Sequence, residues 1–262
     1  MLTSVRSLMA ASVLVGAVLG ATPASADDAA AAPAAKSDLT VTGNVSLVTD
    51  YRFRGVSLSG GDPAIQGGIT VTHSTGLYLG TWSSSLAHTP VYGDQELDLF
   101  GGWSGEVASG LTLDAGLLYY VYPSGHVGDG NYWEPYASIA GALGPAKLKV
   151  GMAYDWKQKG LLDNAGNKDD NIYVYSNLDV GVPGTPLTVS GHVGYTDGVL
   201  SPCYYCAGTA TFNDRTGWDW SIGASATVLG PLSLGVSYIG VSGASVNNYT
   251  DDAIVGTLTA SF

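Results

Sequence analysis

The chain has 262 residues, of which 12% are charged, 37 are glycine and 16 are tyrosine. Glycine weakens helix interiors and aromatic residues favour strands, so this composition excludes a typical helical bundle and favours an all-β fold. The formal net charge of −12 argues against nucleic acid as a partner, because binding phosphates requires a basic surface.

The first 26 residues have the pattern of a secretory signal peptide. Arg6 precedes an apolar stretch, Leu8–Leu19, and Ala24-Ser25-Ala26 supplies the small residues of a cleavage site. The alternative is an N-terminal membrane anchor, but about twelve apolar residues are too few for a transmembrane helix, which needs roughly 20. We therefore expect export, cleavage after Ala26 and a flexible periplasmic tail over residues 27–37.

From Asp38 onward, apolar and polar residues alternate. Successive side chains on a strand point to opposite faces, so this period indicates strands with one apolar and one polar face. The pattern predicts twelve strands of about ten residues, a length that suits a tilted membrane strand (roughly 9–11) better than a soluble sandwich (about 5–6). The expected strands lie near residues 39–54, 65–71, 77–86, 96–104, 111–120, 131–142, 147–155, 172–180, 187–195, 218–225, 232–241 and 254–262.

The links between these strands alternate between short and long, as in outer-membrane barrels with short periplasmic turns and longer extracellular loops. The short links are Ser74–Gly76, Glu106–Gly110, Leu143–Pro145, Pro183–Pro186 and Leu229–Pro231. The long links are Val56–Asp62, Ala87–Asp94, Pro123–Gly130, Lys157–Asp170, Asp197–Gly217 and Ser242–Asp251. We therefore expect residues 38–262 to form a closed antiparallel transmembrane β-barrel in the outer membrane of a Gram-negative bacterium, in contact with outer-membrane lipids.

Aromatic residues gather near the expected strand ends, where membrane barrels carry their aromatic girdles. These residues are Trp103, Tyr119, Tyr154, Trp156, Tyr195, Trp218 and Trp220. The chain ends in Phe262, a residue type that the outer-membrane assembly machinery reads at this position. We therefore interpret Phe262 as the barrel-assembly signal and expect that machinery as a partner.

The segment Thr49–Ser57, TDYRFRGVS, followed by Asp62–Gly68, DPAIQGG, resembles a proteobacterial family of TorF-type porins. Leu97-Asp98-Leu99, Tyr119–Pro123 and Tyr132-Trp133-Glu134 extend the resemblance over most of the chain after residue 40. The resemblance implies a porin-like outer-membrane barrel and names no solute.

Charged residues on the polar faces are expected to point into the lumen, because facing lipid would cost roughly 2–4 kcal/mol each at the membrane midplane. Arg52 and Arg54 share a face with Asp50 and are candidates to meet acidic residues of other strands. The full set of lumen and selectivity candidates is Asp50, Arg52, Arg54, Glu96, Asp98, Asp114 and Glu134. Two roles remain open for them: bracing the barrel through salt bridges, or selecting solutes.

Cys203 and Cys206 are the only cysteines and lie in a loop that looks like a local addition. The spacing fits a disulfide in an oxidising compartment, and a redox motif or half of a zinc site are the alternatives. A zinc site would need two further ligands, and only His192 is near in sequence. We expect a disulfide, and neither a metal nor a cofactor.

These features together predict a porin-like channel for small hydrophilic solutes and not an enzyme. No phosphate-binding loop, dinucleotide fingerprint or metalloprotease motif is present. One alternative is an outer-membrane hydrolase, because Ser190 and His192 share a strand face, although no Gly-x-Ser-x-Gly motif accompanies them. The other is a structural or adhesive barrel with a plugged lumen. Acidic outer links predict a mild preference for cations, which Arg52 and Arg54 oppose.

Overall fold

The structure is a computed structural model that describes residues 38–206, 209 and 213–262. The expected signal peptide (1–26) and tail (27–37) lie outside the described residues. Among the residues described, no helix is long and apolar enough to span a membrane.

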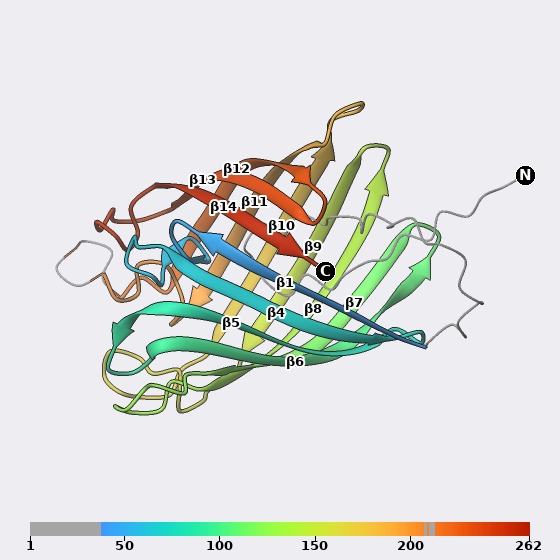
Figure 1. The fold of residues 1–262 in the computed structure, drawn as a ribbon. Helices are drawn as coiled ribbons and strands as arrows, with labels where there is room; N and C mark the ends of the chain where they lie inside the picture. Colours follow the sequence, from blue (N-terminus) through green and yellow to red (C-terminus); the bar gives the residue numbers. More distant parts are fainter. Residues whose placement is uncertain (1–37, 207–208, 210–212) are drawn as a thin grey trace, which may run out of the picture.

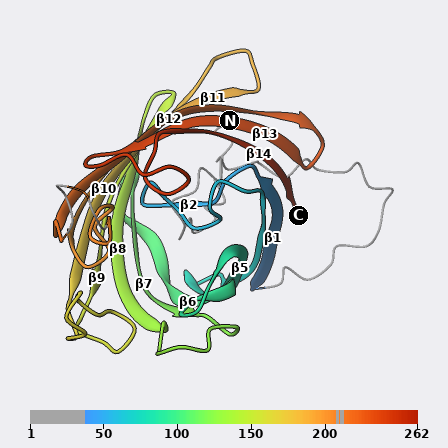
Figure 2. The same cartoon turned by 90° about the vertical axis from the view of Figure 1, so that its left-hand side faces the viewer.

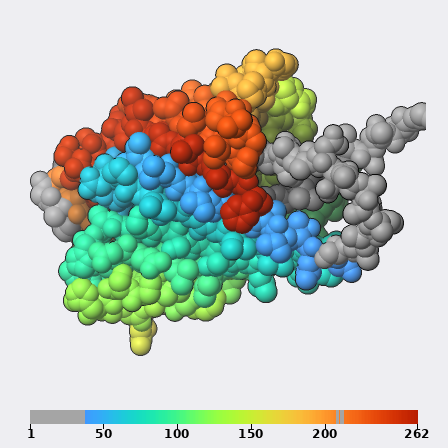
Figure 3. Space-filling model, in the orientation of Figure 1, coloured from blue at the N-terminus to red at the C-terminus, as the bar shows by residue number. Residues whose placement is uncertain are grey.

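Twelve strands form one closed antiparallel β-barrel, as the sequence predicts (Figure 1). The strands are β1 (Leu39–Val48), β4 (Ala64–His73), β5 (Leu77–Thr89), β6 (Gly93–Ala108), β7 (Leu111–Val121), β8 (Tyr132–Leu143), β9 (Ala146–Asp155), β10 (Asn171–Gly181), β11 (Leu187–Gly198), β12 (Thr216–Leu229), β13 (Leu232–Val241) and β14 (Ala253–Ser261). Each strand pairs with the next in this series, and β1 closes the ring by pairing with β14. Figure 3 shows the first (blue) and last (red) strands side by side in a continuous wall.

The alternating sequence pattern separates the two faces of this wall. Val45 and Leu47 of β1 point outward and are 53% and 50% exposed, whereas Ser46 between them is buried and hydrogen-bonded to Thr259 of β14 at 2.8 Å. Apolar side chains cover the outer face of the other strands in the same way. An apolar exterior around a polar interior is the distribution expected for a membrane barrel.

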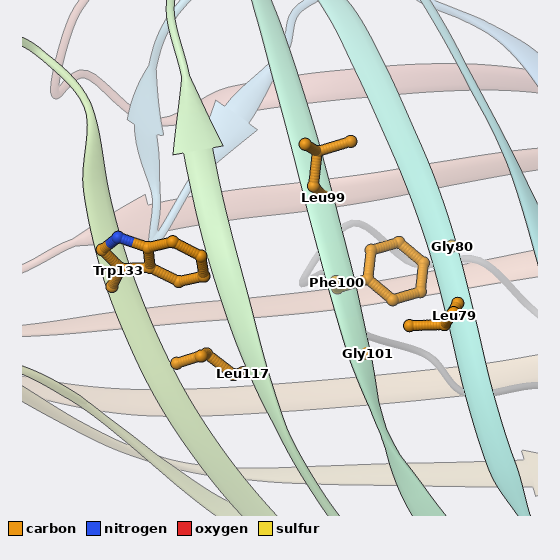
Figure 4. A pocket seen from close by; sticks show the side chains of 7 residues that line it. All are labelled: Leu79, Gly80, Leu99, Phe100, Gly101, Leu117 and Trp133. Carbon is orange, nitrogen blue, oxygen red and sulfur yellow. The ribbon is translucent and has the colours of Figure 1, made fainter.

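A shallow hollow on the outer face illustrates how apolar this surface is. It lies over β5 to β8 and is lined by Leu79, Gly80, Leu99, Phe100, Gly101, Leu117 and Trp133 (Figure 4). Gly101 has no side chain to fill the hollow. A Cβ at this position would collide with the side chain of Leu79. No polar side chain lines the hollow, so it is part of the apolar surface.

Aromatic side chains on the outer face form contacting pairs between neighbouring strands near the loop end of the barrel. Tyr119 stacks on Trp133 with ring centroids 4.2 Å apart. Tyr195 lies 4.9 Å from Trp218, and Trp220 lies 5.3 Å from Tyr238. These pairs lie at the level that an aromatic girdle would occupy.

The link lengths follow the predicted alternation at all positions but one. The longer links are residues 49–63, 122–131, 156–170, 199–215 and 242–252, and the strands that they connect end at one end of the barrel, here called the loop end. The expected long link Ala87–Asp94 is wrong, because β5 and β6 extend into this range and leave only residues 90–92 as a turn. A register shift between Ser85 and Thr89 accompanies this extension, and Thr89 pairs with Gly93.

The first predicted strand also ends earlier than expected. β1 stops at Val48, and residues 49–63 turn into the barrel, where β2 (Arg52–Phe53) and β3 (Val56–Ser57) pair with each other. Figure 2, viewed from the loop end, shows this segment inside the ring of strands. Continued alternation over residues 39–54 predicts that Tyr51 and Phe53 lie on the apolar outer face with Leu47, and this is wrong, because both point into the barrel. We call residues 49–63 the inner hairpin.

Candidate functional site

The inner hairpin has a tight two-residue turn at Arg54 and Gly55. Both residues have positive φ, 49° and 81°, which is the requirement of a type I′ turn. A Cβ on Gly55 would lie 2.2 Å from Cγ1 of Val241 and 3.0 Å from Cβ of Asp219. Gly55 is therefore needed both for its backbone angle and for the close approach of the hairpin tip to β12 and β13.

A hydrogen-bond network holds the base of the hairpin together. The Asp50 carboxylate accepts hydrogen bonds from Arg52 Nε (2.6 Å), Ser57 Oγ (2.6 Å) and Ser59 Oγ (3.0 Å). Arg52 also donates to the backbone oxygen of Asp251 (2.5 Å) and to its carboxylate (3.2 Å). The hairpin is thus connected internally and attached to the loop before β14.

Arg54 connects the hairpin tip to the opposite wall. Its guanidinium forms an ion pair with Glu134 of β8 and lies 3.8 Å from Oδ2 of Asp155 on β9. The same group is 4.7 Å from the ring centroid of Phe53 and 4.3 Å from that of Tyr173 on β10. One buried cation is therefore held by carboxylates and by aromatic faces, which attract cations through their quadrupoles.

Aromatic side chains link the hairpin to β5, β6 and β7. The Tyr51 hydroxyl donates to the two carboxylate oxygens of Glu96 at 3.3 and 3.2 Å, and the Tyr51 ring lies 5.5 Å from that of Trp82. The Tyr120 hydroxyl donates to Glu134 at 3.0 Å. These contacts leave the carboxylates of the wall surrounded by rings and not by solvent.

Asp98 differs from the other carboxylates because it has no partner. It lies on β6 between Trp82 and Tyr120, its directly opposite neighbours on β5 and β7. Its side chain is fully buried, and within the described residues neither carboxylate oxygen has a hydrogen-bond partner. An ionised carboxylate in such a place is costly unless a donor or cation approaches it.

We call the inner hairpin and the inward wall residues around it the lumen cluster. The wall residues are the buried Glu96, Asp98, Tyr120, Glu134, Asp155, Tyr173 and Asp219 and the partly buried Trp82. Acidic groups outnumber basic ones here. The acidic residues of the cluster are Asp50, Glu96, Asp98, Glu134, Asp155 and Asp219, against the basic residues Arg52 and Arg54. The loop half of the lumen therefore carries excess negative charge.

The other half of the lumen, near the short turns, has more balanced charges. Asp114 accepts a hydrogen bond from Tyr78 (2.7 Å), whose hydroxyl also pairs with that of Tyr136 (2.6 Å). Asp179 lies directly opposite Lys147 in the strand register. Asp114 therefore points inward, as expected, but belongs to a different layer from the arginines.

The sequence-based candidates are brought together only in part. Arg54 meets Glu134, one of its expected partners, while Arg52 pairs with Asp50 and Asp251. Asp155, Tyr173 and Asp219 were not chosen as candidates, although their polar-face positions indicated that they point inward. Their role depends on the hairpin, whose inward path the alternation did not predict.

His192 is engaged in a network that leaves Ser190 aside. Its Nε2 lies 2.8 Å from Asp219 and 3.0 Å from the Tyr173 hydroxyl, and its Nδ1 lies 2.5 Å from the Asn177 side-chain oxygen. Within the described part of the chain, Ser190 forms no hydrogen bond with His192. The geometry therefore does not assemble the nucleophile and base that the hydrolase alternative requires.

Cys203 and Cys206 are joined by a disulfide. Tyr204 between them is buried and packs in one apolar cluster with Tyr120 and Tyr132. No group of three or more potential ligands among the described residues could hold a metal ion. The small disulfide loop thus orders an aromatic residue above the lumen cluster.

A family model described as "Bacterial protein of unknown function (Gcw_chp)" matches residues 31–262. No curated protein sequence matches the chain. Among solved structures, the NanC porin has a TM-score of 0.56 at 10% identity over 85% of this chain and 99% of that one. The KdgM porin has a TM-score of 0.54 at 9% identity over 85% and 98%. At these identities the similarity shows the fold alone, which is that of outer-membrane porins.

Proposed function

We propose that this chain, which belongs to the Gcw_chp family of bacterial proteins of unknown function, is an outer-membrane channel for small hydrophilic solutes. The observation that carries the proposal is the charged lumen cluster enclosed by a closed barrel with an apolar outer face. Porins share this arrangement, in which lipid meets the apolar face and solutes meet the polar one. The hairpin would act as the inward loop that narrows the passage.

The proposal includes a location and an orientation. The short turns would face the periplasm of a Gram-negative bacterium and the longer loops the exterior. Phe262 exchanges backbone hydrogen bonds with Gly43 at 2.8 and 2.9 Å, and its ring remains 72% exposed. An exposed terminal ring supports its proposed role as the signal for the assembly machinery. The motif Thr49–Ser57, which resembles TorF-type porins, lies in the inner hairpin. We therefore extend the proposed channel function to that family.

The solute class of one structural neighbour does not transfer to this chain. The KdgM porin is known in complex with oligogalacturonate, a chain of carboxylate-bearing sugars. Such a polyanion would meet the excess carboxylates of the lumen cluster and be repelled. We therefore propose neutral or cationic solutes.

Conductance of the purified protein in planar lipid bilayers tests the proposal. A channel gives discrete current steps in potassium chloride, and liposomes that contain it swell in isotonic small sugars or amino acids. A protein that inserts but gives neither current nor swelling would instead be the plugged structural barrel. Heat-denatured protein is the control for leaks that do not depend on the barrel.

A further inference from the structure

We infer that the lumen cluster contains a binding site for a small organic cation, with an ammonium or guanidinium group, at Asp98. The inference rests on the proposed channel function and names the solute class that the channel would favour. It follows from an unpartnered carboxylate, the aromatic residues on the neighbouring strands, and a cation of the chain itself that pairs with the nearby Glu134.

The carboxylate of Asp98 is the centre of the site. It is fully buried, it has no hydrogen-bond partner, and Glu96 and Glu134 are near enough to repel its charge. Glu96 and Glu134 are each satisfied by a tyrosine hydroxyl, whereas Asp98 is not. A cation at this position would relieve the repulsion among the three carboxylates and supply the missing partner of Asp98.

The neighbours of Asp98 on the adjacent strands are aromatic. Trp82 and Tyr120 flank it on the neighbouring strands. Tyr51 of the hairpin contacts the Trp82 ring at 5.5 Å, and Phe53 contacts the Tyr120 ring at 6.0 Å. Aromatic faces combined with a carboxylate are the usual means by which proteins recognise ammonium groups.

Arg54 shows that the lumen cluster accommodates an organic cation. Its guanidinium lies against the Phe53 and Tyr173 rings and pairs with Glu134. One guanidinium cannot neutralise all the acids of the wall, and among the described residues Asp98 remains without a partner. Arg54 is thus a tethered cation bound to Glu134, and it would compete with a free cation for that carboxylate.

A divalent metal fits the site less well than an organic cation. Among the described residues, no group of three or more acidic, histidine or cysteine side chains is placed to hold a metal ion. The flanking residues Trp82 and Tyr120 are aromatic, and aromatic rings suit a large, weakly hydrated cation.

The test uses choline as the probe and 3,3-dimethyl-1-butanol, its uncharged analogue of equal shape, as the control. Both are titrated against the potassium current of single channels in planar bilayers. We expect choline to block the current at concentrations at least about tenfold lower than its neutral analogue, since only choline gains the charge-dependent contacts.

Two variants with opposite expected effects on choline block, Asp98→Asn and Arg54→Gln, separate a binding role from a structural one, and Asp179→Asn is the control. Asp98→Asn should weaken choline block about tenfold, whereas Asp179→Asn, which removes a lumen carboxylate opposite Lys147 outside the cluster, should leave it within about twofold. Arg54→Gln should strengthen block several-fold because it removes the competing cation. Unchanged electrophoretic heat-modifiability of each variant would show that the barrel is intact.

The outcomes distinguish this inference from the channel proposal. Current steps without a difference between choline and its neutral analogue would overturn the cation site and leave the channel in place. Equal weakening by Asp98→Asn and Asp179→Asn would show a general effect of lumen charge and also overturn the site. No current from the wild-type chain or from Arg54→Gln would overturn both the channel and the site.

Discussion

Arg54 and Asp98 are both buried charges in the lumen, but only one of them is neutralised locally. Arg54 has an ion pair and two aromatic faces, and it occupies a backbone conformation, φ 49°, that non-glycine residues rarely adopt. Asp98 has neither a donor nor a cation. Residues that cost stability in this way concentrate at functional sites, where the same unmet interactions serve a ligand.

Asp98→Asn should therefore increase the stability of the barrel. The amide has nearly the shape of the carboxylate but carries no charge, so the repulsion from Glu96 and Glu134 disappears. We expect the free energy of unfolding to rise by about 1–3 kcal/mol, because burying a neutral amide costs less than burying a charge without a partner. Urea titration of the folded form in lipid vesicles measures it. A stability lower than that of the wild type would mean that the Asp98 carboxylate has a stabilising partner.

The outward and inward faces can be tested with two adjacent residues of β14. Leu258 points outward and is 41% exposed, whereas Thr257 points inward opposite Gly235 of β13, where space is available. Leu258→Arg should impair assembly, because arginine facing lipid costs roughly 2–4 kcal/mol near the midplane. Thr257→Arg should be tolerated. The yield of heat-modifiable protein in outer membranes compares the two, and equal yields would contradict the assignment of faces.

The sequence predicts the direction of most lumen side chains but not their partners. Glu96, Asp98 and Glu134 were placed inward because strand residues alternate and charge is costly in lipid. Which of them would be paired depended on the hairpin path, and alternation between two faces contains no information about a segment that leaves the sheet. The Arg54–Glu134 ion pair joins residues of different strands, so no local spacing indicates it.

At the level of elements, β1 shows where a periodic pattern misleads. The alternation runs from Leu39 to Arg54, but a strand of that length exceeds the roughly 9–11 residues that cross a membrane. This excess length was the available signal that the segment bends. The ten residues of β1 satisfy the membrane requirement, and Tyr51 and Phe53 of the hairpin turn inward, where the wall residues Trp82 and Tyr120 provide aromatic partners.

Gly55→Ala should displace the inner hairpin without opening the barrel. An added Cβ would meet Val241 at 2.2 Å, and the positive φ of 81° costs a further ~1 kcal/mol. We expect a larger single-channel conductance, because the hairpin tip can no longer reach the wall. The measurement is current per step in 1 M potassium chloride.

Gly60→Ala is the matched control for this change. Gly60 lies in the same hairpin with a φ of 69°, but a Cβ there would meet only Ala87 at 3.4 Å. The control has the same backbone strain without the clash, so its conductance should remain near that of the wild type. An increase of similar size in both variants would attribute the effect to strain and not to displacement of the tip.

For the whole molecule, charge is distributed unevenly between the mouth and the interior. Arg215 in the link between β11 and β12 pairs with Asp169 and Asp170, and Lys157 lies 3.4 Å from Asp169. Burial alone would raise the pKa of Asp169, but the backbone N–H of Asp170 and the guanidinium of Arg215 lower it overall. Asp169 thus stays ionised but is neutralised locally, so the mouth is less negative than its sequence indicates.

Acidic residues nevertheless remain in excess from the mouth to the lumen cluster, so the open channel should prefer cations. The outer residues Asp62, Asp129, Asp163 and Asp214 form no salt bridge among the described residues, and the two arginines that could favour anions are themselves paired with carboxylates. Reversal potentials in a potassium chloride gradient measure this preference.

Charges at the mouth are screened within about 8 Å at physiological salt, whereas the buried cluster is screened less. We therefore expect the preference to weaken but persist as salt is raised. A preference for anions would mean that Arg52 and Arg54 dominate selectivity despite their partners. Complete loss of selectivity at high salt would assign it to the mouth alone.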